Sequence, residues 1–64
     1  MNIKELKNII KNNGLTQADV AKHLGISLRT FNSKINKGIF GSDEMEKMID
    51  LLHIKDPAKI FFGQ

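Results

Sequence analysis

The segment 15–38, LTQADVAKHLGISLRTFNSKINKG, limits the possible folds of this chain more than any other stretch. Thr16 and Asp19 stand three residues apart, the spacing of a capping box, in which two side chains satisfy free backbone N–H groups at a helix start. A helix over 17–24 would end at Gly25, because the left-handed conformation at a helix end costs a residue with a Cβ about 1–2 kcal/mol. The inward side of this helix is expected to carry Ala18, Val20, Ala21 and Leu24. The first half of the segment therefore predicts a short helix and a tight turn.

The second half of the segment predicts another helix, over about 28–36, with Ser27 as its N-cap. Phe31 and Ile35 are spaced i and i+4, which gives this helix one buried stripe. The other side of the helix faces solvent and is the candidate binding surface. The side chains expected there are Leu28, Arg29, Asn32, Ser33 and Asn36.

Apolar residues recur at helical spacing in two further stretches, 3–12 and about 43–53, and a short fifth helix is expected over 57–62, after the Asp56-Pro57 step. Ser42 is expected to cap the helix over 43–53, and Asp56-Pro57 places a cap before a proline at the first helical position. No stretch shows the alternating pattern of a strand. The sequence therefore predicts an all-α, five-helix fold in a single domain over residues 1–64.

Two pairs of large apolar residues lie outside these helical stripes. Ile39 and Phe40, between two glycines, are expected to fold back onto the core. Phe61 and Phe62 are adjacent, and a core this small does not accept both. The outward one of the two is a candidate contact between two copies of the chain, with packing across the domain's own surface as the alternative.

The composition bounds the class of protein. Sixty-four residues allow one domain with one small core. The chain is 41% hydrophobic and 27% charged, the ordinary range for a soluble globular protein. No run approaches the roughly 20 apolar residues of a membrane span, and the N-terminus lacks a signal-peptide pattern. We therefore expect a cytoplasmic protein without a membrane partner.

Residues that carry catalytic or metal chemistry are sparse. His23 and His53 are the only two imidazoles, there is no cysteine, and no His-x-x-x-His pair occurs. A small helical bundle also offers no deep pocket in which Ser, His and Asp side chains would be gathered. We expect neither an enzyme nor a cofactor or metal.

Charge is distributed unevenly along the chain. Residues 1–38 hold seven Lys and Arg against two acids, whereas residues 39–64 hold three against five, so the balances are +5 and −2. The positive half contains the segment 15–38. This distribution is expected when one face meets phosphates, although solvated surface lysines explain the charge count by itself.

The segment over about 16–36 resembles the helix-turn-helix of the Cro/repressor-type (XRE-like) family of phage and bacterial transcription regulators. The matching residues are Leu15-Thr16-Gln17, Val20-Ala21, Leu24-Gly25-Ile26-Ser27, Thr30-Phe31 and Lys34-Ile35-Asn36. The resemblance implies a sequence-specific regulator of double-stranded DNA, a phage or prophage Cro-like repressor. The helix over 28–36 would enter the major groove. Because one short domain makes few contacts, we expect a homodimer on a pseudo-palindromic operator, with Phe61 or Phe62 as the candidate dimer contact.

Base and phosphate contacts follow from this docking. Arg29 is the strongest candidate for base readout, because a guanidinium donates two hydrogen bonds to guanine O6 and N7. The expected base-contacting residues are Leu28, Arg29, Asn32 and Ser33. The expected phosphate-contacting residues are Thr16, Gln17, Lys34, Asn36, Lys37 and Lys11, with Gln17 assigned by the resemblance.

A protein-binding module is the alternative function. An antirepressor or antitoxin would keep the same scaffold and capture its partner with the C-terminal half, which carries methionine and phenylalanine. The scaffold does not decide between the two, because a fold hosts many functions. Arg29 and the positive charge of residues 1–38 favour DNA.

Overall fold

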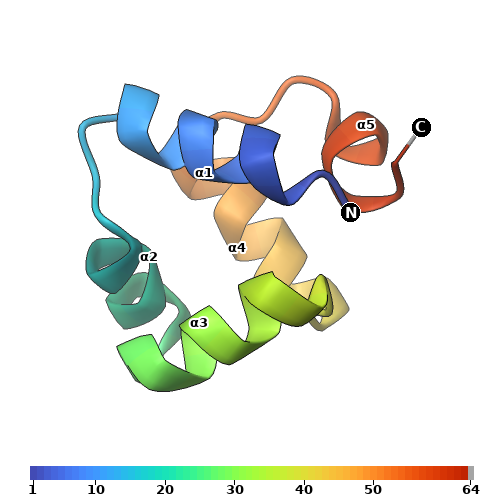
Figure 1. The fold of residues 1–64 in the computed structure, drawn as a ribbon. Coiled ribbons are helices and arrows are strands. Elements are labelled where there is room, and N and C mark those ends of the chain that lie inside the picture. The colour runs from blue at the N-terminus through green and yellow to red at the C-terminus, as the bar shows by residue number, and fades with distance from the viewer. Residues whose placement is uncertain (64) are drawn as a thin grey trace.

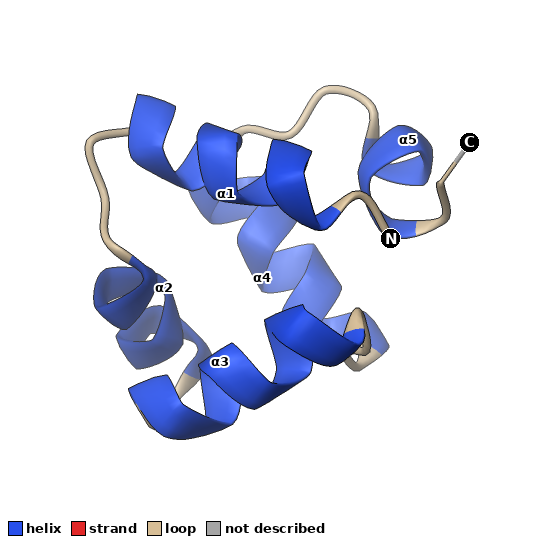
Figure 2. Cartoon of the chain, viewed as in Figure 1, coloured by secondary structure: helices blue, strands red, loops and turns tan. Residues whose placement is uncertain are grey.

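The computed structural model of the chain describes residues 1–63 and contains five helices joined by short loops (Figure 1). They are α1 (Ile3–Asn12), α2 (Gln17–Leu24), α3 (Leu28–Lys37), α4 (Ser42–Leu52) and α5 (Pro57–Phe61). Figure 2 shows helices and loops alone, and no residue from 1 to 63 lies in a strand. None of these helices is long and apolar enough to cross a membrane. The prediction of an all-α, five-helix fold is confirmed.

Helix α4 runs through the middle of the molecule, with α1 above it and α3 below it in Figure 1. Helix α2 lies at one side and joins α1 to α3, and α5 lies at the other side next to the N-terminus. The backbone N–H of Asn2 donates to the carbonyl oxygen of Ile60 at 2.7 Å, which attaches the start of α1 to α5. The outer side of α3 is left uncovered by the other helices (Figure 1).

One hydrophobic core joins all five helices. The largest fully buried side chains are Phe31, Leu6, Ile35, Met48 and Val20. Phe40 adds its ring from the loop after α3, with its centroid 5.6 Å from that of Phe31 and the planes tilted by 49°. Burying each large apolar side chain stabilises the fold by roughly 1.5–3 kcal/mol. The packing around Phe31 therefore fixes α3 against the rest of the molecule.

Local capping explains why the first helices begin where the sequence predicts. The Thr16 hydroxyl accepts from the backbone N–H of Asp19 at 3.1 Å, and the Asp19 carboxylate accepts from the backbone N–H of Thr16 at 2.8 Å. The prediction that Ala18 faces inward is wrong, because its side chain is exposed. At about 100° per residue, Ala18 lies more than a quarter turn from the middle of the buried stripe of α2.

The start of α4 differs from the prediction by one residue. Gly41, and not Ser42, is the N-cap, and Ser42 is the first helical residue. The backbone N–H of Gly41 donates to Glu44 Oε1 at 2.8 Å, so the glutamate three residues into the helix satisfies the free N–H without a side chain at the cap. At the other end, the predicted last residue His53 is the C-cap, in a left-handed conformation with φ 54°.

Each pair of adjacent apolar residues splits between core and solvent. Phe40 is 8% exposed and Ile39 is 67% exposed, so only one of the two folds back onto the core as predicted. Phe61 is 6% exposed and Phe62 is 66% exposed. Phe61 is therefore removed as a candidate contact for a second copy of the chain, and Phe62 is the outward residue.

Candidate nucleic-acid interface

The turn between α2 and α3 is closed by its own backbone. Gly25 has φ 76°, and its N–H donates to the carbonyl of Lys22 at 3.1 Å. The next N–H, from Ile26, donates to the carbonyl of Ala21 at 3.0 Å, which completes a Schellman-type end of α2. No other atom lies within 4 Å of where a Cβ on Gly25 would be, so the glycine is required by its conformation and not by crowding.

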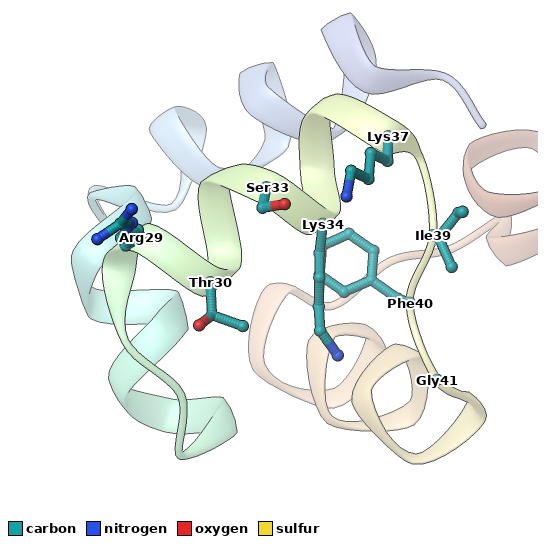
Figure 3. Close-up of a pocket in the computed structure, with 8 residues that line it drawn as sticks. All are labelled: Arg29, Thr30, Ser33, Lys34, Lys37, Ile39, Phe40 and Gly41. Carbon is teal, nitrogen blue, oxygen red and sulfur yellow. The ribbon is translucent and has the colours of Figure 1, made fainter.

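Helix α3 has a buried face and an opposite face that is fully available. Phe31 and Ile35 are 0% and 1% exposed. Arg29, Ser33 and Lys37 follow one another at i, i+4 and i+8 along the opposite side, and all three are exposed (Figure 3). The core contact therefore orients a row of two cations and a hydroxyl outward.

The predicted base-contacting side chains of α3 make no hydrogen bonds to the rest of the described chain, although neighbouring side chains form the cap. The Ser27 hydroxyl accepts from the backbone N–H of Thr30 at 3.1 Å and donates to the Thr30 hydroxyl at 3.0 Å, so these two side chains serve the cap. The four predicted base-contacting residues are all exposed, and none of their side chains has a hydrogen-bond partner within residues 1–63. These are Leu28, Arg29, Asn32 and Ser33.

At the start of α2, the two predicted phosphate contacts differ in availability. The Thr16 hydroxyl accepts from one N–H and donates to Asp19 Oδ2 at 3.0 Å, so it already serves the capping box. Hydrogen bonds from the backbone N–H and then the hydroxyl of Thr16 lower the pKa of Asp19. A carboxylate therefore stands next to Thr16, which makes this hydroxyl a poor phosphate contact. Gln17 is half-buried, and its amide has no partner within residues 1–63.

The remaining phosphate candidates lie in two separate places. Asn36 and Lys37 are exposed at the end of α3, close to the base candidates in sequence. Lys11 is exposed in the last turn of α1, and Figure 1 shows α1 across the molecule from α3. The structure therefore brings Asn36 and Lys37 onto the uncovered side of α3 and does not bring Lys11 there.

Lys34 is paired with a glutamate that sequence reasoning did not single out. Its Nζ donates to both carboxylate oxygens of Glu44, at 2.8 and 2.9 Å. These bonds, followed by the bond from the Gly41 N–H, lower the pKa of Glu44. The pairing argues against Lys34 as a phosphate contact. No local sequence pattern predicts this ion pair, because Lys34 and Glu44 are ten positions apart on different helices.

An open hollow of about 640 Å³ lies between α3 and the loop that follows it (Figure 3). The α3 wall carries Arg29, Thr30, Ser33, Lys34 and Lys37, and the loop wall is Ile39, Phe40 and Gly41. The flank of α3 next to this loop is thus concave, with basic side chains on the helix side and apolar ones on the loop side. No three His, Cys, Asp or Glu side chains of residues 1–63 are placed to hold a metal ion.

The comparison with protein families matches this part of the molecule. Residues 6–37, half of the chain, match the model of a family described as winged helix-turn-helix DNA-binding. The matched range contains most of α1 and all of α2 and α3. No curated protein and no solved structure matches the chain. After the matched range, residues 38–63 contain α4 and α5 and no strand.

Proposed function

Because the chain belongs to the winged helix-turn-helix DNA-binding family, we propose that it is a sequence-specific regulator that inserts α3 into the major groove of double-stranded DNA. One observation supports this docking above all others. The face of α3 opposite Phe31 and Ile35 is uncovered and carries Arg29, Ser33 and Lys37 in one row.

The first half of α3 supplies the base contacts in this proposal. Arg29 donates to guanine O6 and N7, a pairing worth roughly 1–3 kcal/mol of discrimination. Asn32 meets an adenine edge, Ser33 donates to or accepts from either kind of base, and Leu28, which is 44% exposed, contacts a thymine methyl. None of these side chains has to leave an internal partner before it binds.

Phosphate contacts set the register of the docked helix. We assign them to Asn36 and Lys37 at the end of α3 and to Gln17 at the N-terminus of α2, where the helix dipole also favours an anion. Thr16 is a weaker partner because its hydroxyl serves Asp19. Lys11 lies outside this set, on α1.

Two copies of the chain are expected on each operator. Helix α3 has 10 residues and is roughly 15 Å long, so it spans about four base pairs. One copy therefore reads too little sequence for useful specificity. Two copies on a pseudo-palindromic site, with half-sites about one helical turn apart, double the readout. Phe62, which is exposed at the end of α5, is the proposed contact between copies.

The narrower role follows from the sequence resemblance. We propose a Cro-like repressor of a phage or prophage, which acts by occupying its operator. The alternative is an antirepressor or antitoxin that binds a protein. Its supporting observation is that Ile39 and Phe62, in the acidic half of the chain, are exposed and could contact a partner.

Selection of bound duplexes from a random pool tests the proposal. The expected result is one enriched pseudo-palindromic motif, with a guanine at the position that faces Arg29. Binding to random duplex should also weaken steeply with added salt, because each phosphate contact releases counterions. A chain that enriches no motif and shows no salt-dependent binding to any duplex would be a protein-binding module.

A further inference from the structure

The contact between Lys34 and Glu44 is the single ion pair within residues 1–63, and it joins α3 to the start of α4. Lys34 Nζ lies 2.8 and 2.9 Å from the two carboxylate oxygens. Glu44 is held from a second side by the Gly41 N–H, at 2.8 Å. The Lys34 side chain is 35% exposed and that of Glu44 is 13% exposed, so the pair is shielded but lies at the surface.

The pair lies on the side of α3 that faces α4. Lys34 lines the same hollow as Arg29 and Lys37, but Figure 3 shows its side chain directed toward Gly41 and the start of α4. Arg29 and Lys37 take part in no ion pair within residues 1–63. The three cations of α3 therefore divide into two free ones and one that is already neutralised.

We propose that Glu44 holds Lys34 away from DNA phosphates and thereby determines which flank of α3 the DNA backbone follows. This inference rests on the proposed DNA binding. With Lys34 bound, the cations that meet phosphates and bases on α3 are Lys37 and Arg29. At the flank next to α4, the Lys34–Glu44 pair has no net charge, and Asp43 in the first turn of α4 adds a negative charge that disfavours phosphate.

Two physical reasons support the proposal. A phosphate would have to replace a charge-assisted contact in which one ammonium serves both oxygens of a carboxylate that Gly41 keeps in place. A free lysine at this position would also add affinity for every sequence alike, because phosphate contacts do not distinguish bases. Pairing Lys34 therefore lowers non-specific binding and leaves the readout by Arg29 untouched.

The test compares the salt dependence of binding to random duplex for the intact chain and three variants. These are Glu44→Gln, Lys34→Met and the double variant. Glutamine keeps an oxygen that accepts from the Gly41 N–H, and methionine keeps the length of the lysine stem. Thermal unfolding of each variant checks that the fold is retained.

Glu44→Gln should release Lys34 to the phosphates. The slope of log affinity against log salt should steepen by about 0.9, so that this variant loses about 3.5-fold more affinity between 50 and 200 mM salt than the intact chain. Lys34→Met should leave the slope unchanged, and the double variant should match Lys34→Met. These three results together support the proposal.

Two further variants serve as controls. Glu46→Gln changes the net charge equally but removes an exposed carboxyl of α4 that takes part in no ion pair within residues 1–63, so it should leave the slope unchanged. Lys37→Met removes a proposed phosphate contact and should flatten the slope by about 0.9.

Four outcomes would overturn the inference. A flatter slope for Lys34→Met would mean that Lys34 contacts phosphate in the complex. An unchanged slope for a folded Glu44→Gln, or a gain that persists in the double variant, would mean that lysine release plays no part. If the intact chain binds no duplex at any salt concentration, the proposed function fails and this inference with it, whereas the first three outcomes leave DNA binding in place.

Discussion

Arg29 and Lys37 are exposed cations on the same face of α3, but their chemistry differs. A guanidinium is a planar fork that matches two acceptors on one guanine, whereas an ammonium is a compact charge that suits a single phosphate oxygen. Arg29 stands in the first turn, the part of a reading helix that reaches base edges, and Lys37 is the last helical residue. The position and the chemistry of each side chain therefore favour the same role, base readout for Arg29 and phosphate contact for Lys37.

Arg29→Ala should weaken binding to the selected operator by on the order of 1–3 kcal/mol and relax the preference at one base pair. Its side chain has no ion pair or hydrogen bond within residues 1–63, so the free energy of unfolding should stay within about 0.5 kcal/mol. Competition between duplexes that differ at single positions measures the preference. Lys47→Ala, which removes a cation from the exposed side of α4, is the control, and an Arg29→Ala variant with the intact preference would exclude direct readout by this residue.

His53 is the only non-glycine residue of the described chain with positive φ, at 54°. The left-handed conformation costs a residue with a Cβ about 1–2 kcal/mol, and glycine avoids this cost. Glycine also loses more conformational entropy on folding than histidine does, which cancels part of the gain. His53→Gly should therefore raise the free energy of unfolding by roughly 0.5–1 kcal/mol, measured in urea. The same change at His23, inside α2, should lower it by a similar amount. Equal effects at both sites would contradict this account.

At the scale of helices, the sequence predicts those helix ends that depend on residues close together in the chain. The Thr16–Asp19 capping box, the left-handed Gly25 and the Asp56 cap with its proline are all local, and the helices they delimit begin where expected. The predicted start of α4 is one residue later than the observed start, because serine is a more common N-cap than glycine. Glu44 reaches back to the Gly41 N–H instead, a choice that the glycine at this position does not reveal.

The contact between α3 and α4 should make stability depend on acid. The pKa of Glu44 is lowered from its usual 4.5 by Lys34 and the Gly41 N–H. A carboxyl with a lower pKa in the folded chain adds stability above its ordinary pKa, and this contribution disappears as the pH falls through the lowered value. The intact chain should therefore lose its stability advantage over Glu44→Gln below about pH 4.5.

Thermal unfolding across this pH range measures the effect. Glu46→Gln is the matched control, since Glu46 is exposed on the same helix and has no ion pair within residues 1–63. If the difference between the intact chain and Glu44→Gln were constant from neutral to acid pH, the carboxylate would not contribute through its charge.

At the scale of the molecule, the exposed apolar residues lie in two regions, because Leu28 and Ile39 are next to the cations of α3 and Phe62 is at α5. Three of the seven cations of residues 1–38 lie on α3 and three on α1, across the molecule from it, whereas Phe62 directly follows α5, the helix next to the N-terminus (Figure 1). The sequence does not show which of Phe61 and Phe62 is buried, because so short a helix has too few apolar positions to define a buried side. Nor did any pattern show that Lys34 would meet Glu44, ten residues away. The exposed side of α3, by contrast, follows from Phe31 and Ile35 alone.

Phe62→Ala should leave the fold intact and reduce the share of operator occupied by two copies at once. The side chain is 66% exposed, so its removal costs the isolated chain little. Phe61→Ala is the contrasting variant, which should lower the free energy of unfolding by roughly 3–5 kcal/mol because its ring is buried. Gel shifts across a concentration series distinguish single from double occupancy. Unchanged double occupancy of Phe62→Ala would place the contact between copies elsewhere.

The bond between the Asn2 N–H and the Ile60 carbonyl makes neighbours of the two ends of the chain. Helix α5 has only five residues and could not persist alone, so its folding is coupled to that of α1. Amide hydrogen exchange at Asn2 should then report the opening of the terminal helix as well as its own. Met1 also lies beside Gly38, the C-cap of α3, because a Cβ on Gly38 would be 3.4 Å from the Cβ of Met1. A fusion to the N-terminus would therefore be attached next to the end of α3.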